Sequence, residues 1–190
     1  MNYRKVAYIA VFGALWGLWE MSAGSVVHAL NLPVKGVIMS SVGIFILLVG
    51  RTFVPEAGSS FTIGAIAATL KIFSFGGIVL SPFLAILIES SLAEIFLTFT
   101  RSSLPGYIFA GGTAVMWSPL HRLLIQGLIF SSRIYEFYLQ LLKQASRLLH
   151  IPESRAILLF VAYLLFLFIL GSLVGLAAYF IGRTLKREVR

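Results

Sequence analysis

The segment that most constrains the fold lies near the C-terminal end of the chain. Residues 156–182 contain no charged side chain and are dominated by Leu, Phe, Ala and Ile. About 20 consecutive apolar residues are enough to cross the hydrocarbon core of a bilayer as an α-helix. We therefore predict a transmembrane helix over this segment.

The composition extends this prediction to the whole chain. Hydrophobic residues make up 59% of the sequence and charged residues only 12%, an apolar share well above that of a soluble domain. The net charge of +8 does not indicate nucleic-acid binding, because the basic residues are scattered among apolar segments or gathered near the ends. We expect a single all-α integral membrane domain over residues 1–190, with the lipid bilayer as its surroundings.

Five further apolar segments are separated by glycine, proline and charged residues, which are typical breaks between helices. They cover approximately residues 6–27, 37–50, 61–75, 78–99 and 107–130. Residues 133–155 instead mix leucine with basic residues at helical spacing, which predicts an amphipathic helix at the interface or capping the bundle. The sequence thus predicts about six transmembrane helices, of which the second and third are short, plus an amphipathic helix between spans five and six.

Basic residues at both ends predict the topology. Arg4 and Lys5 precede the first apolar segment, and Arg183, Lys186, Arg187 and Arg190 follow the last one. Cytoplasmic flanks of membrane helices carry an excess of lysine and arginine. We expect a multi-pass protein of the cell (plasma) membrane with both termini in the cytoplasm. The first segment carries Glu20 and lacks a small-residue cleavage site, so we interpret it as a retained span rather than a signal peptide.

Polar side chains within the predicted spans are candidates for function, because ionisable groups are costly at membrane depth. The candidate substrate-binding residues are Glu20, Lys71, Glu89, Trp117, His121, Arg122 and Gln126. Ser118, Arg122 and Gln126 are spaced four apart and share one helix face, with Trp117 and His121 on the adjacent stripe. An aromatic ring beside hydrogen-bonding groups is typical of a pocket for a flat, polar ligand.

A structural interpretation of the same residues stands beside this one. The charged members of the set could neutralise one another inside the bundle, and Trp117 could be an interface anchor. Arg51 and Arg101, which follow predicted spans, are interpreted as contacts to lipid headgroups.

Small residues form a stripe on the first segment. Ala10 and Ala14, and likewise Gly13 and Gly17, are four apart and would lie together on a narrow helix face. Such a face lets another helix approach closely in lipid. The stripe predicts a surface for docking a partner protein, with internal helix packing as the alternative. Gly171 and Gly175 form a second close-packing pair in the last span.

Enzyme motifs are absent from the sequence. The three histidines are far apart, no HExxH or Walker motif occurs, and the absence of cysteine excludes thiolate chemistry. We expect no catalytic activity, no cofactor and no metal site.

The overall pattern resembles the substrate-binding S component of an energy-coupling factor (ECF) transporter. The features that carry the resemblance are the size of the chain, its six apolar segments, and the alanine-x-x-x-alanine pair at Ala10 and Ala14. A glycine-bearing last helix and a basic tail add to it. The resemblance implies a membrane subunit that captures a vitamin or micronutrient, docks through Ala10 and Ala14 on a membrane coupling subunit, and depends on ATPases supplied by other chains.

Two alternatives from other classes remain open at this point. One is a membrane scaffold without transport activity, such as a rod-shape-determining protein of the MreD type. The other is a small secondary carrier that works alone.

Overall fold

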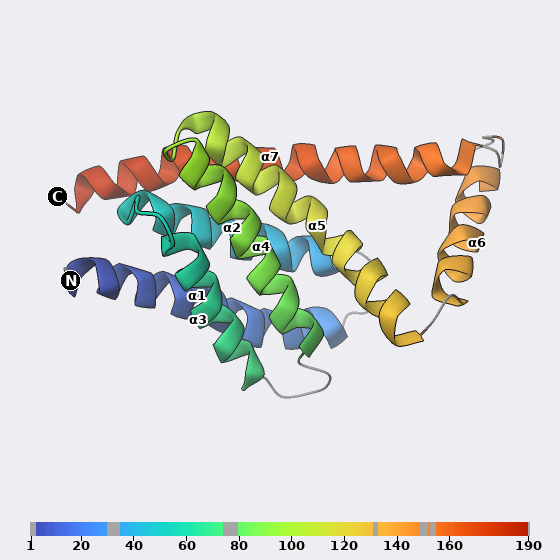
Figure 1. Ribbon diagram of the computed structural model, residues 1–190, viewed down its shortest axis with the longest axis horizontal. Coiled ribbons are helices and arrows are strands. Elements are labelled where there is room, and N and C mark those ends of the chain that lie inside the picture. Colours follow the sequence, from blue (N-terminus) through green and yellow to red (C-terminus); the bar gives the residue numbers. More distant parts are fainter. Residues whose placement is uncertain are drawn as a thin grey trace.

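The computed structural model describes residues 3–29, 35–73, 80–130, 133–148, 152 and 155–189, and the elements in these ranges are helices (Figure 1). They are α1 (Tyr3–Ala29), α2 (Lys35–Phe53), α3 (Ser59–Ile72), α4 (Leu80–Phe99), α5 (Leu104–Phe130), α6 (Arg133–Leu148) and α7 (Ala156–Glu188). Each predicted segment coincides with one of these helices. The prediction of an all-α chain is therefore confirmed for the described residues.

Four helices are long and apolar enough to cross a membrane, namely α1, α2, α4 and α7. Helix α5 has 27 residues, which is ample length, but it carries several polar side chains and Pro119. Helix α3 has only 14 residues and at 1.5 Å per residue extends about 21 Å, short of the ~30 Å hydrocarbon core. The structure thus supports a multi-pass membrane protein with four candidate spans. The predicted number of six is reached only if α3 and α5 also cross the membrane.

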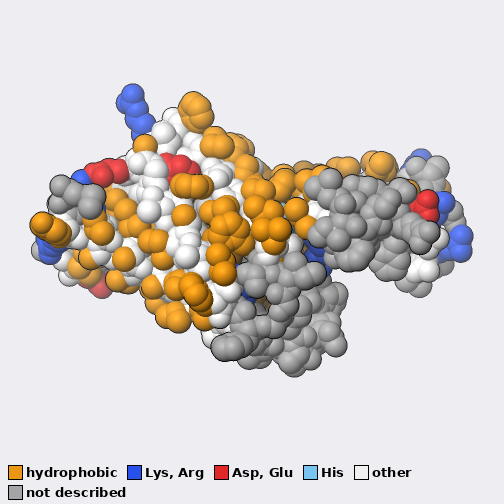
Figure 2. All heavy atoms as spheres, turned by 60° about the horizontal axis from the view of Figure 1, so that its bottom comes forward, with side chains coloured by type: hydrophobic (Ala, Val, Ile, Leu, Met, Phe, Trp, Pro, Cys, Tyr) orange, Lys and Arg blue, Asp and Glu red, His pale blue; other side chains and the backbone are white. Residues whose placement is uncertain are grey.

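The helices form a bundle with both described ends of the chain on the same side (Figure 1). Helix α2 contacts α1, α5 and α7, whereas α3 packs between α1 and α4. The core between them contains large apolar side chains that are fully buried, including Trp16, Ile44, Leu47 and Ile63. Hydrophobic side chains also spread over the visible outer surface rather than gathering in one patch (Figure 2), as expected of a protein surrounded by lipid.

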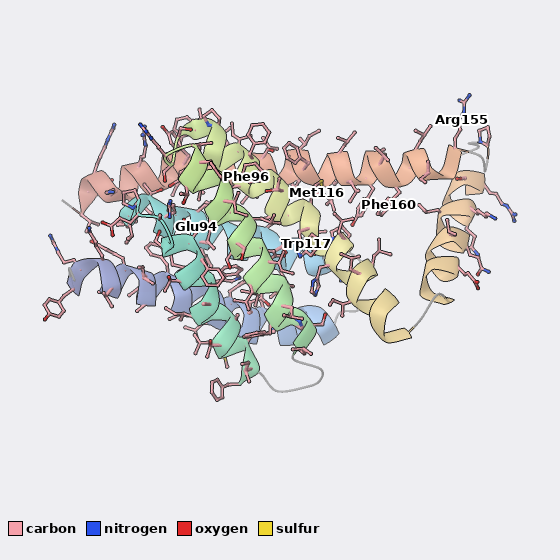
Figure 3. The ribbon with its side chains drawn as sticks, in the orientation of Figure 1. Glu94, Phe96, Met116, Trp117, Arg155 and Phe160 are labelled. Atoms are coloured by element: carbon pink, nitrogen blue, oxygen red, sulfur yellow. The ribbon has the colours of Figure 1, made fainter. Side chains whose placement is uncertain are left out.

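Helix α6 stands at the far end of the molecule, opposite the two ends of the chain (Figure 1). Among the described elements it contacts only α5 and α7. Its polar and apolar residues segregate to different faces, so the predicted amphipathic helix between the fifth and last apolar helices is present. The first half of α7 follows it, and Figure 3 places Arg155 at the junction of the two.

Glycines set the closest helix contacts. A Cβ atom added at Gly171 would lie 2.8 Å from the carbonyl carbon of Gly111, and one at Gly175 would lie 2.8 Å from the carbonyl carbon of Tyr107. Helices α5 and α7 therefore approach backbone to backbone, as small residues allow in membranes. The predicted close-packing pair on the last span is confirmed.

The glycines and the alanines of the small-residue stripe on α1 differ in burial. Gly13 and Gly17 are buried, and Cβ atoms there would lie 2.7 Å from Ile66 and 2.6 Å from Leu70 on α3. Ala10 is exposed and Ala14 half-buried. Internal packing, the alternative interpretation of the stripe, therefore accounts for the two glycines, and only the alanines remain on the outer side of the helix.

Arg51 is enclosed by the protein, so its interpretation as a headgroup contact is wrong. Its side chain is buried, with the whole residue 1% exposed, and it forms an ion pair of 3.0 Å with Glu94 on α4. The Glu94 carboxylate also accepts hydrogen bonds from the backbone N–H groups of Gly58 and Ser60, where a negative charge is favoured at the start of α3. This network joins the ends of α2, α3 and α4.

Candidate functional site

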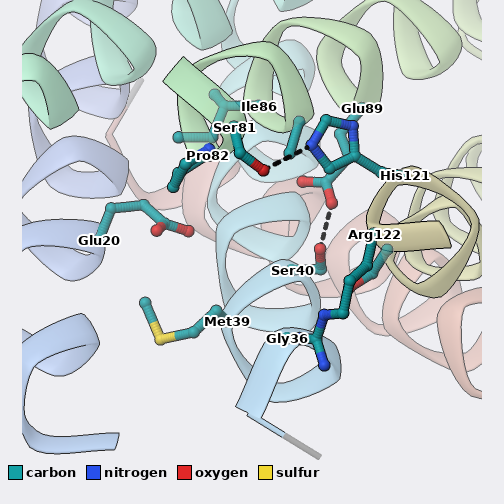
Figure 4. A pocket seen from close by; sticks show the side chains of 12 residues that line it. Glu20, Gly36, Met39, Ser40, Ser81, Pro82, Ile86, Glu89, His121 and Arg122 are labelled. Atoms are coloured by element: carbon teal, nitrogen blue, oxygen red, sulfur yellow. Dashed lines mark hydrogen bonds between the residues drawn. The ribbon is translucent and has the colours of Figure 1, made fainter. Parts of the chain in front are cut away.

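A cavity of about 370 Å³ lies between α1, α2, α4 and α5 (Figure 4). Its polar lining residues are Glu20, Ser40, Ser81, Glu89, Ser118, His121 and Arg122, and its apolar ones include Met39, Pro82 and Ile86. Pockets of this volume that combine apolar walls with a few convergent polar groups are typical small-molecule sites. We refer to it below as the polar cavity.

Glu89 of α4 is the most enclosed charged group in this cavity. Only 4% of the residue is exposed, and its Oε1 atom accepts a hydrogen bond from the hydroxyl group of Ser40 on α2 (Figure 4). Glu89 forms no ion pair with any residue in the described ranges. A buried carboxylate with a single serine donor is costly to maintain, so a further donor on a bound molecule would stabilise it.

Glu20 on α1 contributes the second carboxylate. The residue is 8% exposed, and its Oε2 atom lies 3.5 Å from Nζ of Lys71. Lys71 also donates a hydrogen bond of 2.5 Å to the backbone carbonyl of Glu20. Lys71, on α3, contacts Glu20 without lining the cavity. The Glu20 side chain points into the cavity (Figure 4).

Helix α5 provides the opposite wall. The hydroxyl group of Ser81 and Nε2 of His121 share a hydrogen bond of 3.2 Å, which ties the start of α4 to α5. The ring of Trp117 lies 6.1 Å, centroid to centroid, from that of His121, but Trp117 does not line the cavity.

Arg122 stands next to the first turn of α2. A Cβ atom at Gly36 would lie 3.0 Å from Nη2 of Arg122 and 2.9 Å from Oγ of Ser118. The absence of a side chain at Gly36 thus makes room for the guanidinium group. Within the described part of the chain, no carboxylate forms an ion pair with Arg122.

The structure brings together four of the seven predicted substrate-binding residues, which are Glu20, Glu89, His121 and Arg122. Lys71 and Trp117 do not line the cavity. Lys71 forms an ion pair with Glu20, and the ring of Trp117 lies beside that of His121. The side chain of Gln126 is outside the described part of the structure, although its backbone belongs to α5.

Sequence reasoning missed Ser40 and Ser81 as lining residues. A serine in a membrane helix commonly bonds to its own backbone, as Ser22 and Ser91 do here, so serine alone is a weak signal. The spacing of Gly36 and Ser40, four residues apart, was the available clue, because it places a gap and a hydroxyl group on one face of α2.

Comparison with known proteins finds no family model, no curated protein and no solved structure that matches this chain.

Proposed function

We propose that this protein is a membrane subunit that captures a small water-soluble molecule, of vitamin or micronutrient size, for uptake into the cell. The observation that carries the proposal is the polar cavity, in which side chains from four helices converge inside a largely apolar bundle. A bundle that served only as a scaffold has no evident need for the polar Glu89 side chain inside it, because burying such a group with one hydrogen-bond partner is costly.

The lining defines the chemistry of the proposed ligand. Glu20 and Glu89 accept hydrogen bonds, so they favour a ligand with N–H groups or a positive charge. Arg122 offers a planar set of donors that suits a carboxylate, a carbonyl group or a ring nitrogen. A small molecule with both a cationic or donor-rich end and an acceptor end matches this arrangement.

The proposed direction of capture is from outside. Residues of the polar cavity lie near the first turns of α2 and α4 and in the second halves of α1 and α5, away from the described ends of the chain. The basic residues at those ends favour the cytoplasmic side. With the termini inside, six crossings including the short α3 and the polar α5 give a cavity that faces outward.

The chain carries no nucleotide-binding motif, so we propose that ATP-driven partners supply the energy, as in ECF transporters. Ala10 and Ala14 belong to the proposed docking face for a membrane coupling subunit. Ala10 is exposed and Ala14 half-buried, and the neighbouring Val11 and Leu18 also point outward. This surface is apolar, and the small side chains of Ala10 and Ala14 would let another helix approach closely.

The test is to purify the protein and identify small molecules that remain bound to it by mass spectrometry. The same preparation is made with Glu89→Gln and with the control Glu56→Gln, which removes an exposed carboxylate paired with Lys5 at the opposite end. We expect the wild type and the control to retain a polar ligand and Glu89→Gln to lose it. Equal retention by all three proteins would contradict the proposed site.

Reconstitution in liposomes distinguishes the proposed subunit from a carrier that works alone. The isolated chain should bind the ligand without accumulating it. Accumulation driven by an ion gradient, with no other protein present, would replace the proposal with a secondary carrier.

A further inference from the structure

A second cavity, of about 260 Å³, lies at the end of the bundle that carries both described ends of the chain. It is formed by the end of α2, the turn between α4 and α5, the start of α5 and the last turns of α7. Its lining includes Thr52, Arg101, Tyr107, Tyr179, Arg183 and Lys186. We refer to it as the basic cavity, and it shares no lining residue with the polar cavity.

The charged residues that line the basic cavity all carry a positive charge. Three of its lining residues are basic and none is acidic. Glu94 pairs with Arg51 and Glu56 pairs with Lys5, and the exposed Glu188 at the end of α7 does not line the cavity. The lining therefore produces a positive potential that an anion would neutralise.

An aromatic ring and a backbone carbonyl orient two of the basic side chains. The guanidinium carbon of Arg183 lies 4.2 Å from the centroid of the Tyr179 ring. Nζ of Lys186 donates a hydrogen bond of 2.5 Å to the backbone carbonyl of Thr52. The hydroxyl groups of Thr52 and Tyr107 share a hydrogen bond of 2.8 Å. The cationic groups are thus partly fixed around the cavity before any ligand arrives.

The turn that supplies Arg101 has an uncommon backbone. Arg101 has a φ angle of 51° and Ser102 one of 55°, a left-handed conformation that residues other than glycine rarely adopt. A backbone hydrogen bond of 2.7 Å from Ser102 to Leu97 and a contact of 3.2 Å from Nε of Arg51 to Oγ of Ser102 hold it. Such conformations cluster at binding sites, where the surrounding structure enforces them.

Apolar surface adjoins the basic cavity. Phe180 packs edge to face on Tyr179 with 5.5 Å between ring centroids. Phe180, Leu173 and Ile169 are exposed and follow one face of α7, which runs from beside the cavity toward the middle of the helix. An anion that occupied the cavity could therefore place attached hydrocarbon chains on this face. Basic pockets between membrane helices, flanked by apolar surface, suit the headgroups of anionic lipids.

We propose that the basic cavity binds the phosphate group of an anionic phospholipid from the leaflet on the side of the chain termini. Arg101 and Arg183 contact the phosphate oxygens, and the acyl chains lie along Phe180, Leu173 and Ile169. This site is independent of the proposed transport function, because it uses different residues at the other end of the bundle. Free phosphate shares the headgroup chemistry but lacks the acyl chains.

The test uses the full chain purified in a mild detergent. Short-chain phosphatidylglycerol, phosphatidylcholine and inorganic phosphate are titrated separately, and bound ligand is measured by native mass spectrometry. The variants are Arg101→Gln and Arg183→Gln, and the control is Arg187→Gln, which removes an equal charge from the same helix end without lining the cavity. Arg101 is exposed, so its variant should fold even if Arg183→Gln does not.

We expect phosphatidylglycerol to bind preferentially and each cavity variant to weaken its binding about tenfold, the effect of losing one charge-assisted hydrogen bond. The control should change the affinity less than about threefold. An equal loss of lipid affinity in all three variants would refute a specific site, because it would show that the basic surface attracts anionic lipid without using the cavity. Binding of inorganic phosphate as tight as that of the lipid would overturn the lipid assignment, as would the absence of any preference over phosphatidylcholine.

Discussion

Replacement of Gly175 by alanine tests how closely α5 and α7 are packed. The new Cβ atom would lie 2.8 Å from the carbonyl carbon of Tyr107 and 3.3 Å from Cα of Ile108, and the carbonyl oxygen of Tyr107 is nearer still. These neighbours are backbone atoms, so a change of rotamer cannot relieve the contact. The two helices would have to separate by about 1 Å or more to restore ordinary contact distances.

The magnitude follows from two opposing effects. Overpacking typically costs about 1–3 kcal/mol, and a clash with backbone belongs at the upper end of that range. Alanine in place of glycine in a helix recovers about 1 kcal/mol. We therefore expect Gly175→Ala to lower the free energy of unfolding by about 2 kcal/mol. For a chain of this length, that corresponds to a fall of about 4–8 °C in the melting temperature.

The matched control is Gly112→Ala, at the same helix pair. There a Cβ atom would meet the ring edge of Phe168 at 2.7 Å and Oγ of Ser172 at 2.8 Å, and both are side-chain atoms that can rotate away. Thermal unfolding of both variants is followed by circular dichroism in the same detergent, and we expect the control to stay near the wild type. If the melting temperature of Gly175→Ala equals that of the wild type, α5 and α7 do not approach backbone to backbone at this position.

Three further predictions concern buried charge and docking. Arg51→Gln should destabilise the protein by about 3 kcal/mol, because it leaves Glu94 uncompensated, and a denaturant titration that finds less than about 1 kcal/mol would contradict the network. Lys71→Met should lower the melting temperature by stranding Glu20 while the ligand affinity of the folded fraction stays within about threefold; loss of affinity without loss of stability would make Lys71 a ligand contact. Ala10→Trp should abolish ATP-driven uptake with partner subunits and leave ligand binding by the purified chain intact, whereas normal uptake would exclude Ala10 from the docking face.

The helices themselves could be predicted from the sequence because their signal is local. Long apolar runs such as residues 156–182 permit only a membrane helix or a buried one, and the glycine and proline breaks divide the rest. The amphipathic segment from Arg133 was equally visible, since its charges recur at helical spacing. The number of membrane crossings was harder to predict. A 14-residue helix such as α3 is longer than a typical loop but shorter than the thickness of the hydrocarbon core.

The candidate site was predictable only in part, because its composition depends on which helices are neighbours. Glu89 and Arg122 stand out in any membrane sequence by their charge. The sequence does not reveal, however, that Lys71 reaches Glu20 from α3 or that Arg51 turns inward to Glu94. Gly13 and Ala10 look alike in the sequence, and only the position of α3 separates the buried residue from the exposed one.

The shortness of α3 has a consequence for the surrounding lipid. Phe61 near its beginning and Phe73 just after its end are both exposed, so the apolar flank that α3 presents is about 10 Å thinner than a typical hydrocarbon core. If α3 crosses the bilayer, as the six-span prediction requires, the lipids beside it must compress or the molecule must lean toward it, at a cost of a fraction of a kcal/mol per ångström of hydrophobic mismatch. The opposite flank, formed by the 33 residues of α7, imposes no such thinning. The hydrophobic mismatch then differs between the two sides of the bundle. The tilt of the protein would therefore depend on the thickness of the membrane.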